Sequence, residues 1–231
     1  AISIALFGIL RPGDTLLSIS GDIYDTLQSV VCGENIGSLK DFGVNFEQIE
    51  LRENNFDVQA IENTLKSKKN KMVIIQRSRG YCSRAPLTIA QISEICAKIK
   101  SLSPGTIVFV DNCYGEFVDT KEPTHVGADL IAGSLIKNPG GGLAPTGGYI
   151  AGKEYLINLA AGRLTAPSIG TEVGSYQSGY QYFYQGLYQA PHTVAQAIKG
   201  GMLFSYALSE LGLNTLPKAN EPFHDIICSV V

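Results

Sequence analysis

The sequence lacks the charge patterns of proteins that bind nucleic acid or membranes. Its formal net charge is −3 over 231 residues, and only 17% of the residues are charged. No basic patch and no run of Lys and Arg is present, so we expect no nucleic-acid partner and no anionic membrane partner. No apolar run is long enough to span a bilayer, and no signal-peptide pattern opens the chain. A cytoplasmic protein is therefore expected.

Cysteine is sparse, and its spacing excludes the common zinc motifs. The chain has five cysteines, an odd number at wide intervals, and no CxxC pair. The histidines His125 and His192 also lack metal-ligand spacing to other donors. We expect free thiols in a reducing compartment and no metal site.

Strand-like and helix-like segments alternate along most of the chain. Helical patterns cover 1–10 and 24–31, follow the potential caps Asp57 and Thr88, and dominate from Lys153 onward. The expected strands are 15–20, 46–51, 71–76, 106–110 and 129–132. Because the last of these strands are almost entirely apolar, they indicate a mostly parallel sheet that is covered on both faces. The predicted fold is a three-layer α/β/α domain.

The two ends of the sequence resemble interior segments of a longer protein. Residues 1–10 read as a helix without an N-cap, and residues 225–231 read as a strand with no turn after it. We expect residues 1–231 to form a single large domain that lacks flanking segments of the parent protein.

Polar side chains follow three of the predicted strands. They are QRSR at 76–79, Asp111 with Asn112, and Ser134 with Lys137. In open α/β sheets, ligands bind outside the carboxyl ends of the strands. If neighbouring parallel strands carry these groups, Asp111 and Lys137 lie in one crevice.

An aspartate at one strand end and a lysine after another fit pyridoxal 5′-phosphate (PLP). This cofactor needs a lysine for its aldehyde and a carboxylate that keeps its pyridine nitrogen protonated. Partial burial would lower the pKa of Lys137, as its role as a nucleophile or base requires. Ser134 could donate a hydrogen bond to the phosphate, and the glycines at 140–142 could give the ligand room.

Each of these residues also has an ordinary structural interpretation. An aspartate at a strand end commonly caps a helix or forms a turn, and a lysine before Asn-Pro-Gly is commonly a solvated turn residue. The three glycines match neither the P-loop nor the GxGxxG spacing. The order of Asp111, Ser134, Lys137 and the glycines is more specific than any one of them.

At these residues the sequence resembles the aluminium-resistance protein family, a branch of the fold-type-I PLP enzymes. The family is related to cystathionine β-lyase and methionine γ-lyase, and the resemblance covers nearly the whole chain. The matching segments are LRPGD (10–14), YDTL (24–27), QRSRGY (76–81), VDNCYGEF (110–117), EPTHVGADLIAGSLIKNPGGG (122–142), RLTAPSIGTEVG (163–174) and YQGLYQAPH (184–192).

The resemblance implies a role for each matching position. Lys137 would carry the Schiff base with PLP and move the proton at the substrate α-carbon. Asp111 would pair with the pyridine nitrogen, Ser134 would bind the phosphate, and the ring of Tyr24 would stack on the cofactor. The residues implied to lie close by are Asn112, Gln76 and Arg77.

The resemblance also implies a carbon–sulfur lyase that acts on cystathionine or a related sulfur amino acid. Relatives work as homodimers or homotetramers with shared sites. They carry a phosphate-binding Gly-Thr-His turn just before the position of Ala1. A small domain after the position of Val231 is expected to supply an arginine for the substrate carboxylate.

Two other functions fit parts of the sequence. Ser134 and Lys137 form a Ser-x-x-Lys pattern, as in penicillin-binding acyl transferases, although the accompanying Ser-Asp-Asn and Lys-Thr-Gly motifs are absent. The chain could also be a non-catalytic module that keeps only the PLP fold and dimerises.

Overall fold

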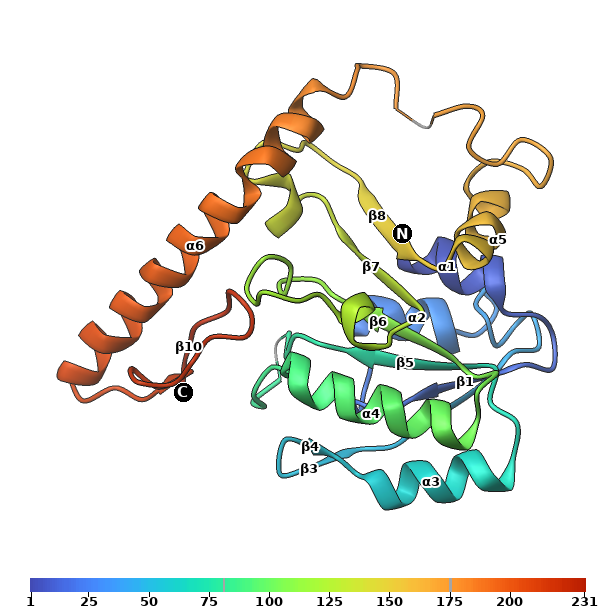
Figure 1. The fold of residues 1–231 in the computed structure, drawn as a ribbon, viewed down its shortest axis with the longest axis horizontal. Coiled ribbons are helices and arrows are strands. Elements are labelled where there is room, and N and C mark those ends of the chain that lie inside the picture. Colours follow the sequence, from blue (N-terminus) through green and yellow to red (C-terminus); the bar gives the residue numbers. More distant parts are fainter. Residues whose placement is uncertain (81, 175) are drawn as a thin grey trace.

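A six-stranded sheet forms the centre of the computed structural model, which describes residues 1–80, 82–174 and 176–231 (Figure 1). The strand order is β2-β1-β5-β6-β7-β8. Neighbouring strands are parallel except for the pair β7 and β8, which is antiparallel. The strands are β1 (Thr15–Ser18), β2 (Asn45–Gln48), β5 (Met72–Gln76), β6 (Ile107–Asp111), β7 (Leu130–Ser134) and β8 (Gly148–Gly152).

Helices cover both faces of this sheet. They are α1 (Ile2–Ile9), α2 (Asp25–Cys32), α3 (Val58–Ser67), α4 (Ile89–Leu102) and α5 (Glu154–Leu164), whereas α6 (Gln181–Glu210) runs away from the sheet (Figure 1). Successive side chains of a strand point to opposite faces. In β6, Phe109 therefore packs in the apolar cluster of α1, α2 and α5, whereas Val108 packs in the cluster of α3 and α4. The predicted three-layer α/β/α fold is confirmed.

The predicted caps set the starts of two helices. The hydroxyl of Thr88 accepts a hydrogen bond from the Gln91 amide at 3.1 Å, and the Gln91 side chain accepts one from the Thr88 amide at 2.9 Å. This reciprocal pair is a capping box. The carboxylate of Asp57 accepts from the Ala60 amide at 3.0 Å and begins α3.

Three predicted strands are clearly shorter in the structure, and the first, expected at 15–20, ends at Ser18. The strand expected at 46–51 ends at Gln48 and gives way to a small hairpin, β3 (Leu51–Arg52) and β4 (Asn55–Phe56). The left-handed backbone of Glu53 and Asn54, with φ of 49° and 61°, makes its turn. The strand expected at 225–231 is only β10 (Ser229–Val230), paired with β9 (Thr215–Leu216).

The glycines after Lys137 serve a different purpose from the one predicted. None of Gly140, Gly141 and Gly142 lines a large cavity. Instead, a Cβ on Gly186 of α6 would lie 2.1 Å from the carbonyl oxygen of Gly140, and a Cβ on Gly141 would lie 2.3 Å from that of Gly186. The glycines thus let the 3-10 turn η2 (Asn138–Gly140) lie directly against the backbone of α6.

Helix α6 is 30 residues long and extends well beyond the sheet (Figure 1). Pro191 lies inside it, and its apolar side chains are largely exposed on the far half. Within the described residues, no helix is both long and apolar enough to cross a membrane.

The contact between α6 and η2 predicts a selective loss of stability. We expect Gly186→Ala to lower the free energy of unfolding by about 1–3 kcal/mol, because the added methyl group would overlap the Gly140 carbonyl. Denaturant-induced unfolding followed by circular dichroism measures the change.

Gly200→Ala in the same helix is the matched control. A Cβ at Gly200 would meet no atom within 4 Å, so alanine should stabilise the helix by about 0.5–1 kcal/mol. Equal stability of the Gly186→Ala protein and the wild type would show that the close approach does not constrain α6.

Candidate functional site

The carboxyl ends of three adjacent parallel strands bring the predicted polar groups together. Gln76 of β5 lies opposite Asp111 of β6, and Asp111 lies opposite Ala132 of β7. Lys137 follows β7 at the start of η2. Strand order thus produces the crevice that the sequence predicts, with Asp111 and Lys137 on the wall of one cavity.

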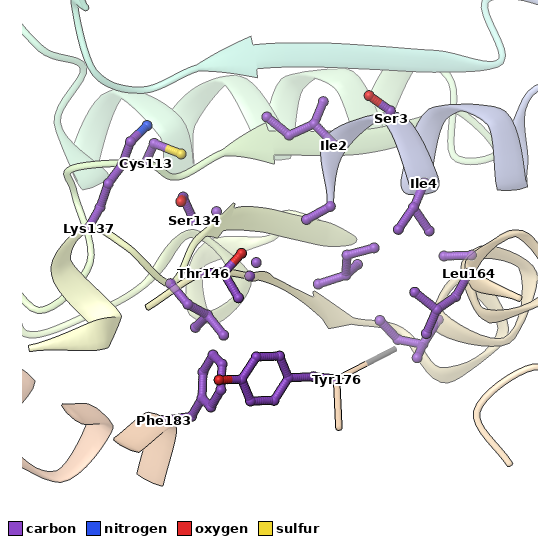
Figure 2. Close-up of a pocket in the computed structure, with 18 of the residues that line it drawn as sticks. Ile2, Ser3, Ile4, Cys113, Ser134, Lys137, Thr146, Leu164, Tyr176 and Phe183 are labelled. Atoms are coloured by element: carbon purple, nitrogen blue, oxygen red, sulfur yellow. The ribbon is translucent and has the colours of Figure 1, made fainter. Parts of the chain in front are cut away.

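Two cavities meet at this edge of the sheet. Cavity A has a volume of about 890 Å³, and its wall includes Ser134, Thr146 and the start of α1 (Figure 2). Cavity B has a volume of about 690 Å³, and its wall includes Gln76, Arg79 and Asp111. Both volumes suit a small-molecule ligand. The residues that line both cavities are Tyr24, Cys113 and Lys137.

The side chain of Lys137 is half-buried on the shared wall. Its Nζ lies 4.1 Å from the centre of the Tyr114 ring and points toward the sulfur of Cys113 (Figure 2). Burial lowers its pKa, but Cys113, Tyr114 and Asp111 outweigh this effect, and the net pKa is raised. The prediction of a lowered pKa is therefore wrong for the protein alone. The reason is that the neighbours Cys113, Tyr114 and Asp111 favour the protonated form of the amine.

Asp111 is a buried carboxylate, and within residues 1–80, 82–174 and 176–231 it has no basic partner. It is 4% exposed, and one of its oxygens accepts a hydrogen bond from the Cys113 amide at 3.1 Å. Among the described residues, no Lys, Arg or His nitrogen lies within 4.0 Å of its carboxylate. Burial raises the pKa of Asp111, while Cys113 and Lys137 oppose the rise. A protonated heterocyclic nitrogen would provide the missing cationic donor.

Cys113 lies between Asp111 and Lys137, although the sequence predicts only a free thiol at this position. Burial and the Asp111 carboxylate raise its pKa to about 12, so the thiol keeps its proton at neutral pH. The five cysteines are all unpaired in the structure. Cys113 is two residues from Asp111, and this proximity was the one signal that could have marked it.

Ser134, Tyr24 and Gln76 lie where the resemblance implies a cofactor. The Ser134 hydroxyl lines cavity A and has no hydrogen-bond partner among the described side chains. Tyr24 precedes α2 and borders both cavities, and its amide donates to Oε1 of Gln76 at 3.3 Å. Gln76 thereby fixes the backbone that presents the Tyr24 ring.

Arg77 and Asn112 lie behind the cavity walls rather than on them. Neither residue lines cavity A or cavity B. The Arg77 guanidinium donates to Asn112 and to the Gly115 carbonyl, both at 2.9 Å, and forms an ion pair with Asp119 at 2.5 Å. The polar groups of Arg77 and Asn112 were expected to face the cofactor, but in the structure they form these bonds instead. The two residues instead hold the loop that follows β6.

Glu116 is a buried carboxyl group that sequence reasoning missed. Its Oε1 accepts a hydrogen bond from the Tyr149 hydroxyl at 2.9 Å, and its Oε2 has no partner in the part of the chain that the structure describes. A Cβ on Gly133 would lie 2.3 Å from Oε1, so only glycine allows this approach. Burial raises the pKa of Glu116 to about 7. Tyr149 is on β8, the strand that was not predicted, so the pair could not be foreseen.

Comparison with known proteins gives a consistent match along the chain. The sequence model of the methionine γ-lyase family matches residues 1–231. The uncharacterised protein YnbB of Bacillus subtilis is 49% identical over 234 residues, which cover 100% of this chain and 55% of YnbB.

Solved structures of similar proteins superpose closely on this fold. One is a carbon–sulfur lyase involved in aluminium resistance from Clostridium novyi, with 48% identity, a TM-score of 0.95, and coverage of 100% of this chain and 56% of that one. Another is a candidate cystathionine β-lyase involved in aluminium resistance from Listeria monocytogenes, with 51% identity and a TM-score of 0.97. The match covers 100% of this chain and 59% of that one. The chain thus spans little more than half the length of these relatives.

The environment of Glu116 predicts a pH-dependent loss of stability. Its pKa is raised from 4.5 to about 7, so the folded protein binds this proton more tightly than the unfolded chain does. The contribution is fully present below pH 4.5 and is lost as the pH rises through 7, by up to about 3 kcal/mol. Glu116→Gln should remove this part of the pH dependence, as measured by urea unfolding at pH 5 and pH 8.

The exposed Glu94 provides the control, because Glu94→Gln should leave the difference between the two pH values unchanged. If Glu116→Gln also keeps the wild-type difference, Glu116 does not titrate in this range.

Proposed function

This chain belongs to the methionine γ-lyase family, and we propose that it forms the cofactor-binding part of a PLP-dependent carbon–sulfur lyase. The substrate is a sulfur amino acid such as cystathionine. The observation that carries the proposal is the buried Asp111, which has no basic partner among the described residues and shares cavity B with Lys137. The identity to carbon–sulfur lyases of known structure supports it.

The residues around the two cavities match the chemical groups of PLP. Nζ of Lys137 would hold the aldehyde carbon, and Asp111 would hold the proton of the ring nitrogen. The Ser134 hydroxyl and the start of α1, where Ser3 also lines cavity A, would receive the phosphate. The exposed face of the Tyr24 ring would cover the pyridine. When bound, PLP supplies an electron sink for the substrate α-carbon.

Lys137 would then carry out the proton transfers. Its Nζ would take the proton from the substrate α-carbon and return one to the departing sulfur. A protonated ring nitrogen next to Asp111 would offset the negative field that raises the pKa of Lys137. A larger fraction of the amine would thereby be unprotonated and able to accept a proton when the site is loaded.

Two alternatives are weaker. Acyl transfer through Ser134 needs a hydrogen bond between its hydroxyl and Lys137, but Nζ of Lys137 points toward Cys113 (Figure 2). A non-catalytic module would bind PLP without turnover.

We also propose a homodimer or homotetramer, supported by the exposed apolar side chains of α6 such as Tyr188 and Leu203.

Lys137 should be required for covalent attachment of the cofactor. Addition of PLP to the wild-type protein should produce an absorption band near the visible edge, and borohydride reduction should fix the cofactor to the residue. Lys137→Ala should abolish both signals, because no other amine borders both cavities in the described chain. Absorption spectra and peptide mass spectrometry measure the result.

The control is Lys153→Ala, since Lys153 is exposed and paired with Asp129. Identical spectra for the Lys137→Ala protein and the wild type would refute the assignment of Lys137.

Asp111→Asn should separate cofactor binding from turnover. The amide has nearly the same shape but cannot stabilise a protonated ring nitrogen. We expect the PLP spectrum to persist while the rate of thiol release falls about 100-fold or more. A substitution that leaves the rate unchanged would contradict the proposed role, and loss of folding would be visible in the circular dichroism spectrum.

A further inference from the structure

The ring of Tyr114 lies against the amine of Lys137. The distance from Nζ of Lys137 to the centre of the ring is 4.1 Å. The face of an aromatic ring carries partial negative charge and attracts a cation that lies within about 6 Å of its centre. Tyr114 and Lys137 also line cavity B together. An aromatic face and the amine of the proposed reaction therefore share one wall.

The backbone of Tyr114 has a conformation that suits glycine better than tyrosine. Its φ is 68°, in the left-handed region. Few residues other than glycine adopt this region, and a bulky one does so at an energetic cost. Such residues gather at functional sites, where the surrounding structure holds them in place. A ring that is kept at this position points to a role for the ring itself.

Hydrogen bonds fix the Tyr114 loop to the turn that carries Lys137. The Tyr114 carbonyl accepts from Nδ2 of Asn138 at 3.1 Å and from the Ile226 amide at 3.2 Å. Nδ2 of Asn138 also donates to the Glu116 carbonyl, at 2.9 Å. Asn138 is 4% exposed and directly follows Lys137 in the chain. Asn138 thus holds the ring near the amine, through bonds that use only the backbone of the Tyr114 loop.

The groups around the amine favour its protonated form. Burial lowers the pKa of Lys137, but three neighbours raise it, namely Cys113, Tyr114 and Asp111. Burial also raises the pKa of Cys113, to about 12, and that of Tyr24, which borders both cavities, so both keep their protons. The ring nitrogen of the proposed cofactor would neutralise Asp111, whereas the attraction of the Tyr114 face would remain.

We propose that the aromatic face of Tyr114 binds the ammonium form of Lys137 whenever the amine is not attached to a cofactor. The inference rests on the proposed function for the reaction that it serves. When Nζ takes the substrate α-proton, the C–H bond breaks, an N–H bond forms, and the electron pair stays with the substrate. The ring would hold the resulting ammonium ion in place until the proton passes to the departing sulfur. Tyr114 is therefore a further catalytic residue.

Exchange of the Tyr114 side chain separates the ring from the rest of the residue. Tyr114→Phe keeps the aromatic face and removes only the hydroxyl. Tyr114→Leu removes the aromatic face, and its bulky side chain meets the same backbone constraint as tyrosine. Tyr114→Met does so with an unbranched side chain, which provides a second test if leucine disturbs the loop. Circular dichroism shows whether each variant is folded.

Phe117→Leu is the matched control for the loss of an aromatic side chain. Phe117 lies in the same loop, also has a left-handed backbone, with φ of 61°, and is exposed. It lines neither cavity A nor cavity B. Its exchange should leave both of the following measurements unchanged.

The first measurement uses the protein without cofactor. Trinitrobenzenesulfonate reacts only with unprotonated amines, so its reaction rate with Lys137 across a pH series reports the protonation of this amine. Peptide mass spectrometry follows Lys137 and, as an internal reference, the exposed Lys199. The plateau of the rate at high pH reports accessibility, and the rate at pH 8 relative to this plateau reports the unprotonated fraction.

Loss of the aromatic face should make Lys137 release its proton more easily. We expect the relative rate at pH 8 to rise about 3- to 10-fold in Tyr114→Leu and Tyr114→Met. Tyr114→Phe should return the relative rate to within about two-fold of the wild type, because a phenylalanine ring also attracts cations. Lys199 should react alike in all variants.

The second measurement is turnover with PLP and L-cystathionine. Tyr114→Leu should lower kcat about 10-fold and leave KM nearly unchanged, because the ring acts on the amine and not on substrate binding. Relative to Tyr114→Leu, Tyr114→Phe should restore most of kcat. A defect that merely disturbed the fold would not be rescued by the aromatic ring alone with the relative labelling rate at pH 8 moving in step.

Four results would overturn the role of Tyr114. They are a wild-type relative rate in both Tyr114→Leu and Tyr114→Met, an equal rise in Tyr114→Phe, an unchanged kcat in Tyr114→Leu, and unfolding of both ring-free variants, which would assign the ring to folding. The two measurements also separate this inference from the proposed function. A ring-dependent labelling rate in a wild type without a cofactor band would refute the lyase while keeping the contact between ring and amine. Wild-type turnover with a ring-independent labelling rate would do the reverse.

Discussion

The site depends on the burial of one carboxylate, Asp111, at the end of β6. The strands on either side, β5 and β7, exclude water from its backbone, and the Cys113 amide satisfies one of its oxygens. No basic side chain of the described residues neutralises it within 4.0 Å, and its pKa rises in consequence. An isolated charge of this kind is costly to the fold, so its presence points to a cationic ligand group rather than to stability.

The loop after β6 is held from behind by a buried polar network. Arg77 binds Asn112 and the Gly115 carbonyl, and Asn112 donates to Glu122 at 2.8 Å. These bonds place Tyr114 under Nζ of Lys137. The polar residues behind the cavities thus position those on the walls. Rigid support of this kind is what a site needs when it must hold a cofactor ring in one orientation.

The sequence predicts the layered fold and the meeting of Asp111 with Lys137. Both predictions rest on local signals, namely the spacing of apolar residues along helices and strands and the polar residues at the ends of strands. It does not predict β8, whose GYIAG segment is short and glycine-rich, and so the buried pair of Tyr149 and Glu116 stays hidden. The purpose of the glycines after Lys137 was wrongly predicted, because a close approach to α6 is a tertiary contact. The pKa of Lys137 was wrongly predicted for the same reason: its neighbours come from another loop.

Arg79 and Asp111 are two charged residues of opposite sign on the wall of cavity B. Both are buried, both line the cavity, and among the described residues neither forms an ion pair. One wall group therefore attracts a cation and the other an anion, with Lys137 on the same wall. A bound cofactor would neutralise Asp111 through its ring nitrogen and leave Arg79 as the unbalanced charge. A buried charge is stabilised by an opposite charge, so the wall of cavity B favours ligands that carry charges of both signs.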